Sequence, residues 1–329
     1  MKYPIDRRAL LKVTAASLGF GALCRVAPLL AEGPAGRALA RSLSGRNGEA
    51  PRPFSFVQMS DTHVGFDGAA NPNGTRAFER AVEQINGLPE RPDLVIFTGD
   101  LTHDSESPGE HADRMKRFRD ISRRLRVPIV KSVPGEHDAG LDGGALYRDV
   151  FGDTSYSFDH KGVHFVALDN VSRGKPTIGE AQLAWLKSDL ARFPSTAPIV
   201  VFTHRPLFDL RPDWEWFTAD GDRATNLLSS FENVTVLYGH IHREHAQQMG
   251  SITHHAARSL IFAFPDPASG SPKKAIPFDP GKPFQNLGIR RIHVAKGVAR
   301  PTSEEIELTL REFSGTVGVQ QFSKEGDSL

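Results

Sequence analysis

Five short apolar runs, each ending in acidic or imidazole side chains, constrain the fold of this chain more than any other feature. The runs are mostly rich in Val, Ile and Phe, as buried strands are, and they cover residues 54–59, 94–98, 129–133, 198–202 and 234–238. In open α/β sheets, ligands bind beyond the carboxyl ends of the strands. We therefore expect an α/β fold in which the five polar clusters, although distant in sequence, converge on one site.

These polar clusters carry the donor atoms of a metal site. They read Asp61-Thr62-His63, Gly99-Asp100, Gly135-Glu136-His137-Asp138, Thr203-His204 and Gly239-His240-Ile241-His242. Imidazoles and carboxylates without a thiolate suit Mn, Fe, Zn, Co or Mg rather than a structural cysteine-type zinc site. A single His at a strand end is more often a polar residue that meets solvent, so the prediction depends on the ordered set.

The order of these motifs resembles that of the calcineurin-like metallophosphoesterase superfamily, D-x-H, G-D, G-N-H-[D/E], H and G-H-x-H, over about residues 53–242. The resemblance implies two mixed β-sheets flanked by helices in an α-β-β-α sandwich. It also implies two metal ions, with Fe, Mn or Zn expected and Mg or Co as alternatives. By position, Asp61, His63 and His242 would bind one ion, Asp100 would bridge both, and Glu136, His204 and His240 would bind the second.

The resemblance further implies a metal-dependent phosphoric ester hydrolase in which a hydroxide between the two ions attacks the phosphorus. His137 would be the catalytic histidine that is not a ligand and that protonates the leaving group. Asp138, next to it, would orient the imidazole or raise its pKa. His103 is expected either to contact phosphate, to support a ligand or to cap the following loop. Arg205 is expected to be either a phosphate contact or a solvated arginine.

Glu136 departs from the superfamily's pattern, because Asn is usual at this position. The carboxylate adds a negative charge, so three carboxylates facing two divalent ions leave about one positive charge, against about two with Asn. We therefore expect Glu136 to hold the second ion more tightly and to make it a weaker Lewis acid. The alternative is that the longer side chain turns away and water takes its place.

The N-terminus resembles a twin-arginine export signal. The sequence Asp6-Arg7-Arg8-Ala9-Leu10-Leu11-Lys12 precedes a mildly apolar stretch at 13–24, and cleavage is expected after Ala40 or an earlier Ala. This stretch is shorter than the about 20 apolar residues of a membrane span. We expect a signal peptide at 1–40, a linker at 41–52, and an exported mature chain, periplasmic or extracellular, without a stable membrane span.

Composition favours a small substrate over long nucleic acid. The formal net charge is +1, and the basic residues are dispersed rather than gathered in a stripe with interleaved aromatics. A small phosphomonoester or phosphodiester is the expected substrate. The alternatives are a lipid-headgroup or nucleotide phosphodiesterase, or a nuclease, of the same superfamily, and a metal-stabilised binding protein without turnover.

The remaining segments are expected to complete one domain over 53–329. Apolar residues at helical spacing predict helices at 76–85 and 178–193, and a third beneath a charged face at 114–126. Strands are predicted at 156–158 and 163–168, joined by a turn at 159–162, and at 289–295 and 305–311, where they would close a second sheet. The Pro- and Gly-rich segment 264–287 is expected to be a long irregular loop.

Three further polar residues lie near predicted strands without being expected to bind metal. Asp169 follows a strand, but the polar sequence after it favours a turn. His254 and His255 continue a predicted strand, so a place in a sheet explains them better than ligation does.

Overall fold

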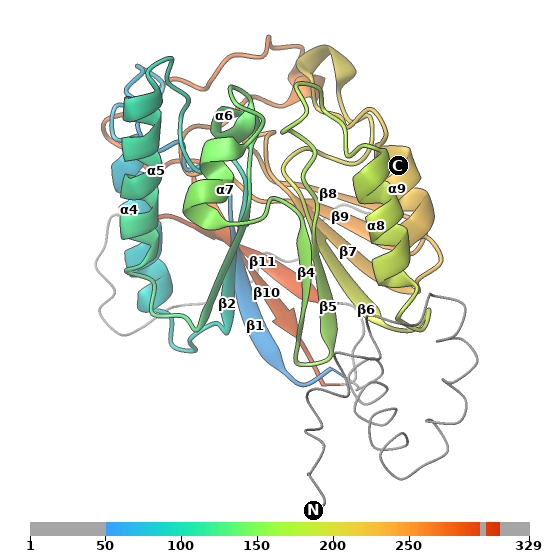
Figure 1. Ribbon diagram of the computed structural model, residues 1–329. Coiled ribbons are helices and arrows are strands. Elements are labelled where there is room, and N and C mark those ends of the chain that lie inside the picture. Colours follow the sequence, from blue (N-terminus) through green and yellow to red (C-terminus); the bar gives the residue numbers. More distant parts are fainter. Residues whose placement is uncertain (1–50, 297–300, 310–329) are drawn as a thin grey trace, which may run out of the picture. The chain divides into compact units, whose positions relative to one another are not determined.

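Figure 1 shows the computed structural model, which describes residues 51–296 and 301–309. The segment expected to be a signal peptide, 1–40, and nearly all of the expected linker at 41–52 lie outside the described residues. Within the described ranges, no helix combines the length and the apolar character that a membrane span requires.

Two mixed β-sheets form the centre of the described chain. The first has the strand order β11-β10-β1-β2-β3. Its parallel strands are β1 (Phe54–Met59), β2 (Leu94–Thr98) and β3 (Ile129–Val133), and they coincide with the first three apolar runs. Antiparallel pairing adds β10 (Gly288–Val294) and β11 (Thr302–Glu307).

The second sheet has the strand order β4-β5-β6-β7-β9-β8. The strands β5 (Val163–Ala167), β6 (Pro198–Phe202), β7 (Asn233–Tyr238) and β9 (Ile252–Ala256) run parallel. The outer strands β4 (Tyr156–His160) and β8 (His245–Met249) run antiparallel to their neighbours. The last two apolar runs thus become β6 and β7, which confirms the predicted strands.

The two sheets face each other across an aromatic layer. Phe54 and Phe56 of β1 point toward the second sheet, where the Phe56 and Phe165 ring centroids lie 5.5 Å apart. Gln58 points the same way, and its amide donates to the Tyr238 carbonyl of β7 at 2.9 Å. Because side chains alternate along a strand, the opposite face of β1 is left for helices.

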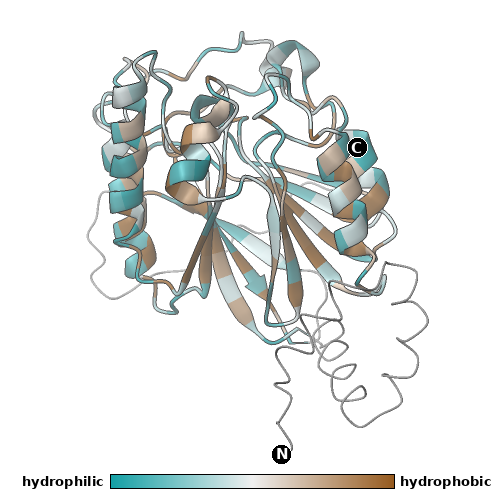
Figure 2. Ribbon diagram, in the orientation of Figure 1, coloured by the Kyte–Doolittle hydropathy of each residue, from teal (hydrophilic) through white to brown (hydrophobic). Residues whose placement is uncertain are grey.

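Helices cover the outer faces of both sheets, which confirms the predicted α-β-β-α arrangement (Figure 1). Against the first sheet pack α4 (Gly74–Asn86), α5 (Pro108–Ser122) and α7 (Ala145–Phe151). Against the second pack α8 (Glu180–Leu190) and α9 (Gly221–Leu228). In Figure 2, brown segments run along the central strands while α4 and α5 are largely teal, as amphipathic covering helices should be.

Several predicted boundaries differ from the structure for local reasons. The helix predicted at 178–193 begins at Glu180, because Gly179 has a left-handed φ of 81°. The one predicted at 114–126 is α5, which begins earlier at Pro108 and ends at Ser122. The hairpin turn is only Lys161 and Gly162, whose φ values of 47° and 84° are those of a tight two-residue turn.

Two expectations about the sheets were wrong. The run at 129–133 was expected to be buried, but β3 is an edge strand that pairs only with β2, and Val130 is 40% exposed. The strand expected at 305–311 is β11, which begins at Thr302 and ends at Glu307. With β10 it extends the first sheet rather than closing a second, because β1 offers a free edge. A buried ion pair between Arg290 and Glu305, 2.7 Å apart, joins β10 to β11.

Three short helices lie in the loops. One turn of α-helix, α6 (Glu136–Ala139), follows β3 directly. The 3-10 helices are η1 (Pro212–Trp214) and η2 (Pro267–Ser269). The segment 264–287 contains η2 but no strand or α-helix.

Candidate metal centre

The loops after β1, β2, β3, β6 and β7 gather at one edge of the two sheets, the upper edge in Figure 1, where α6 lies. The seven residues expected to bind metal all come from these loops. They meet as two groups of four whose candidate ligand atoms lie within 4.8 Å of one another. The two groups share one residue, Asp100.

The first group consists of Asp61, His63, Asp100 and His242, all buried. Nε2 of His63 lies 3.4 Å from Oδ2 of Asp100 and 3.3 Å from Nε2 of His242. The same nitrogen of His242 lies 3.3 Å from Oδ1 of Asp61. Four ligand atoms at this mutual spacing leave a position between them for one cation.

The second group consists of Asp100, Glu136, His204 and His240. Nε2 of His204 lies 3.3 Å from Oδ2 of Asp100 and 2.8 Å from Oε2 of Glu136. Nδ1 of His240 lies 2.8 Å from Oε1 of the same carboxylate. Glu136 therefore points into the centre, and the alternative in which it turns away is wrong.

Two atoms of the second group show that the residues fit a metal ion. Nε2 of His204 and Oε2 of Glu136 are both buried, and although they are 2.8 Å apart, neither makes a hydrogen bond of acceptable geometry. A buried imidazole nitrogen and a buried carboxylate oxygen are rarely left without partners, because burial without a hydrogen bond costs free energy. Ligation of a common cation would satisfy both atoms.

The second nitrogen of three of these histidines is bound by the backbone. Nδ1 of His204 donates to the last carbonyl of β2 at 2.7 Å, and Nδ1 of His242 donates to the Phe262 carbonyl at 3.0 Å. In His240 the roles of the nitrogens are reversed, and Nε2 donates to the Glu215 carbonyl at 3.1 Å. Such bonds select the tautomer and turn the free nitrogen toward a metal.

The backbone is strained at five of the seven candidate ligands. Asp61, His63, Asp100, His240 and His242 all have left-handed conformations, with φ between 41° and 67°. This region is uncommon for residues other than Gly, and such strain costs about 1–3 kcal/mol per residue. Because the strained residues are concentrated in the two groups, we infer that this conformation lowers the stability of the fold but directs the ligand side chains into the centre.

Two glycines of the motifs are required by close approach. A Cβ at Gly99 would lie 2.3 Å from Nδ1 of His204, and one at Gly135 would lie 2.0 Å from Oδ1 of Asp100. Either Cβ would displace a candidate ligand. The glycines therefore set how closely the loops after β2 and β3 can approach the centre.

Comparison with known proteins identifies the family. The family model described as calcineurin-like phosphoesterase matches residues 54–244. The chain belongs to that family. A probable glycerophosphodiester phosphodiesterase, GpdQ, of Arcobacter nitrofigilis is 29% identical over an alignment of 201 residues that covers 57% of this chain and 71% of that protein.

Two further comparisons agree. CPPED1 of Mus musculus, named a serine/threonine-protein phosphatase, is 31% identical over 243 residues, covering 63% of this chain and 76% of that protein. The crystal structure of a dimetal phosphatase from Danio rerio superposes with a TM-score of 0.50 at 16% identity, over 78% of this chain and 100% of that one, which is a likeness of fold. This metallophosphoesterase is a metal-dependent hydrolase of phosphoric esters.

The electrostatics of this metallophosphoesterase centre favour a cation. Burial lowers the pKa of His63 and of His240, which keeps both imidazoles neutral. Burial disfavours the ionised form of Glu136, but His240 and His204 hold its pKa well below the usual range. Burial would also lower the pKa of His204, but Asp100 and Glu136 raise it well above the usual value. A site that stabilises an extra proton in this way stabilises other positive charge as well.

His137 lies beside both groups and pairs with a residue that the sequence did not point to. Its Nδ1 lies 2.6 Å from Oδ1 of Asp104. Burial would lower the pKa of His137, but nearby carboxylates, chiefly Asp100 and Glu136, raise it to about 9. This raised pKa favours the protonated imidazole, with Asp104 holding one nitrogen.

Asp138 does not have the role expected from its place next to His137. Its carboxylate is fully buried and accepts bonds from the backbone N–H groups of Leu101, Thr102 and Gly135, each at 2.9 Å. The Thr102 hydroxyl donates a fourth bond at 2.8 Å. As the third residue of α6, Asp138 points back toward these donors, and it ties the Asp100 loop to the Glu136 loop instead of contacting the imidazole.

His103 contacts both His63 and His137. Its Nδ1 is 3.2 Å from Nδ1 of His63, and its ring stacks on that of His137 with the centroids 4.7 Å apart. The side chain is 31% exposed. The three imidazoles form a third close group of candidate ligand atoms. The structure thus places His103 as a partner of a candidate ligand at the open side of the centre.

Arg205 is half-buried and faces the second group instead of solvent. Its Nη2 lies 3.3 Å from Oε1 of Glu136, and its Nη1 donates to the Glu215 carbonyl at 2.9 Å. The expectation of a solvated arginine is wrong, because the loop after β6 turns the side chain inward.

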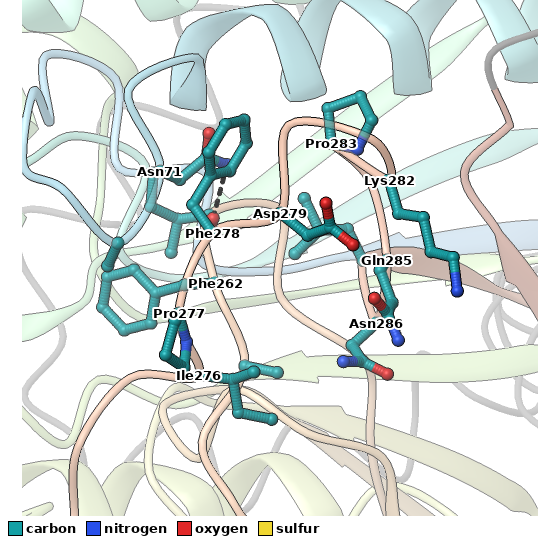
Figure 3. Close-up of a pocket in the computed structure, with 14 residues that line it drawn as sticks. Asn71, Phe262, Ile276, Pro277, Phe278, Asp279, Lys282, Pro283, Gln285 and Asn286 are labelled. Atoms are coloured by element: carbon teal, nitrogen blue, oxygen red, sulfur yellow. Dashed lines mark hydrogen bonds between the residues drawn. The ribbon is translucent and has the colours of Figure 1, made fainter.

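A small pocket lies beside Phe262 (Figure 3). Phe262 and side chains of the segment 264–287 line it, and the Asn71 amide closes one side by donating to the Ile261 carbonyl at 2.6 Å. The Phe262 ring also packs on His242, with the centroids 4.6 Å apart. Phe264, the first residue of the irregular segment, also packs on His242, with the centroids 5.1 Å apart, so this segment borders the metal centre.

Asp169, His254 and His255 lie outside these groups of candidate ligands among the described residues. Asp169 accepts bonds from the N–H groups of Val171 and Ser172, both at 3.0 Å, and so forms a turn. His254 and His255 lie within β9, and neither belongs to a group of candidate ligands among the described residues.

Proposed function

We propose that this chain hydrolyses a small phosphomonoester or phosphodiester at a centre of two metal ions. The first ion would be held by Asp61, His63 and His242, and the second by Glu136, His204 and His240, with Asp100 between them. The observation that carries the proposal is the pair of ligand groups sharing one carboxylate. The mixed imidazole and carboxylate donors suit Fe, Mn or Zn, with Mg or Co as alternatives.

When bound, two such ions supply Lewis acidity toward the phosphoryl oxygens and a nucleophile from water at neutral pH. The leaving group also needs a proton, which we propose that His137 supplies. Asp104 holds Nδ1, so the proton for the leaving group sits on Nε2. His103, stacked on His137 with the ring centroids 4.7 Å apart, is the residue that we propose as a contact of the phosphoryl oxygens.

Replacing Asp104 with Asn is expected to shift the pH dependence of kcat. Bound cations offset the charges of Asp100 and Glu136, which leaves Asp104 as the main carboxylate raising the pKa of His137. His137 donates a proton only below its pKa, so lowering that pKa moves the alkaline loss of activity to lower pH, by about one unit. The measurement is kcat against pH at saturating substrate.

The matched control for this shift is Asp104→Glu, which keeps the charge and should keep the alkaline limb. A lower kcat at every pH with an unshifted limb would mean that Asp104 only orients the ring.

A panel of substrates tests the proposed function. The metal-reconstituted chain would be assayed with p-nitrophenyl phosphate, bis(p-nitrophenyl) phosphate, glycerophosphodiesters and cyclic nucleotides, and we expect turnover of at least one small ester. The named activities of the relatives, a probable phosphodiesterase and a phosphatase, support including both ester classes. No turnover across the panel, with two ions bound, would favour a metal-stabilised binding protein instead.

We also propose that residues 1–40 export the chain by the twin-arginine route to the periplasm or the cell exterior. The support is the order of the Arg pair, the apolar stretch and the small residues in the sequence. Replacing Arg7 and Arg8 with Lys should leave the chain in the cytoplasmic fraction. Unchanged fractionation would count against this route.

A further inference from the structure

Glu136 and Arg205 form an ion pair inside the metal centre. Nη2 of Arg205 lies 3.3 Å from Oε1 of Glu136, and that same oxygen is 2.8 Å from Nδ1 of His240. The arginine side chain is only 11% exposed. Its guanidinium therefore sits directly behind a carboxylate that belongs to the second ligand group.

Hydrogen bonds hold both the backbone and the guanidinium of Arg205 in place. Its backbone carbonyl accepts a bond from the Asn170 amide at 3.0 Å, and its Nη1 donates to the Glu215 carbonyl at 2.9 Å. That same carbonyl accepts the Nε2–H of His240 at 3.1 Å. Glu215 adopts a left-handed φ of 62° to present this carbonyl. One strained residue thus positions the guanidinium relative to a candidate ligand.

The second group contains two carboxylates, Asp100 and Glu136, and Glu136 stands where the superfamily's pattern has an amide. A guanidinium beside Glu136 reduces the cost of burying that additional negative charge. A guanidinium next to Glu136 makes the pair neutral, as an amide ligand would be. The second position then experiences about one negative charge fewer than the sequence alone suggests.

We infer that Arg205 is the counter-charge that allows Glu136 to serve as a ligand, so that the two side chains act as one neutral unit that sets the affinity of the second metal position. This inference rests on the proposed two-ion centre. On this inference Arg205 acts on the affinity for metal and does not contact the substrate phosphate. While Arg205 is present, Glu136 binds the second ion about as tightly as an amide would; without Arg205 it would bind that ion more tightly.

The test measures Mn²⁺ binding to the metal-free full chain by calorimetry, with the number of bound ions counted by elemental analysis. Arg205→Met should tighten the weaker site by about tenfold or more, because a positive charge near the ion is lost. Glu136→Gln should weaken that site by a similar factor, because the arginine then stands uncompensated. The double variant should return to within about threefold of the wild type, and Arg205→Lys should stay close to it.

Arg243 provides a matched control. It follows the candidate ligand His242 as Arg205 follows His204, but its Nη2 pairs with Asp266 at 3.0 Å, outside the ligand groups. Arg243→Met should leave Mn²⁺ affinity unchanged. Lys273 is a second comparison: its Nζ donates to the Trp214 carbonyl at 2.6 Å, and Lys273→Met should have a smaller effect than Arg205→Met.

Three results would overturn the inference. One is unchanged Mn²⁺ affinity in Arg205→Met; if calorimetry then also showed weaker binding of inorganic phosphate to the metal-loaded variant, Arg205 would be a phosphate contact instead. Another is a double variant that behaves like Glu136→Gln alone. The third is a larger effect from Lys273→Met. A wild-type chain that binds fewer than two ions would instead refute the proposed centre, and no step of this test depends on turnover.

Discussion

Replacing His137 with Ala is expected to lower kcat by about 10²–10⁴-fold while both metal ions stay bound. The residue lies outside the two groups that share Asp100, and its Nδ1 is taken by Asp104 at 2.6 Å. Loss of the imidazole removes the proton donor without removing a proposed ligand. Metal content by elemental analysis and kcat on the reconstituted protein are the two measurements.

The leaving group makes this test sharper. An alkyl alkoxide needs a proton as it departs, whereas p-nitrophenolate is stable enough to leave without one. The loss in His137→Ala should therefore be large for alkyl esters and small for p-nitrophenyl esters, and His103→Ala should not show this difference. Equal losses for both leaving groups would contradict the role of acid. Loss of an ion would instead point to the trio of His63, His103 and His137 as ligands.

The convergence of the site could be predicted because it depends on local patterns. Each apolar run is long enough for one strand, and parallel strands bring their carboxyl ends to a common edge. The polar residues at those ends, from Asp61 to His242, were therefore expected to converge regardless of the conformations of the loops. The same reasoning does not predict the order of strands in a sheet, because strand pairing joins segments that are distant in sequence. For that reason the edge position of β3 and the addition of β10 and β11 to the first sheet were missed.

The partner of His137 could not be predicted from proximity in sequence. Asp138 is adjacent, but the first turn of α6 directs it toward the backbone N–H groups of Leu101 and Gly135. Asp104, which is 33 residues away, reaches the imidazole because the loop after β2 folds back over the site. The one available signal was its place directly after His103, within four residues of Asp100.

The charge of Glu136 shows the same limit. The sequence reveals a carboxylate where an amide is usual, but not what stands behind it. Arg205 reaches that carboxylate only because the loops after β3 and β6, from different sheets, meet at the centre. The effect on metal affinity that was predicted from the charge of Glu136 alone therefore changes once its contact with Arg205 is known.

Replacing Asp100 with Ala is expected to remove both activity and metal. Its Oδ2 lies 3.4 Å from Nε2 of His63 and 3.3 Å from Nε2 of His204, so one carboxylate serves both groups. Two cations held by neighbouring groups would repel each other, and the negative charge of Asp100 would offset part of that repulsion. Bound metal should fall from two ions to at most one, and hydrolysis should fall to the level of chelator-treated wild type.

Thermal unfolding supplies a second readout for Asp100→Ala. A ligand present at 100 times its Kd stabilises the folded state by about 2.7 kcal/mol, and this increment should disappear when metal is added to the variant. The proper control is Asp104→Asn, which removes a neighbouring carboxylate that belongs to neither group and should bind both ions. If Asp100→Ala kept two ions, each group would fill independently. The carboxylate would then only orient its neighbours, and the two positions would not act as one centre.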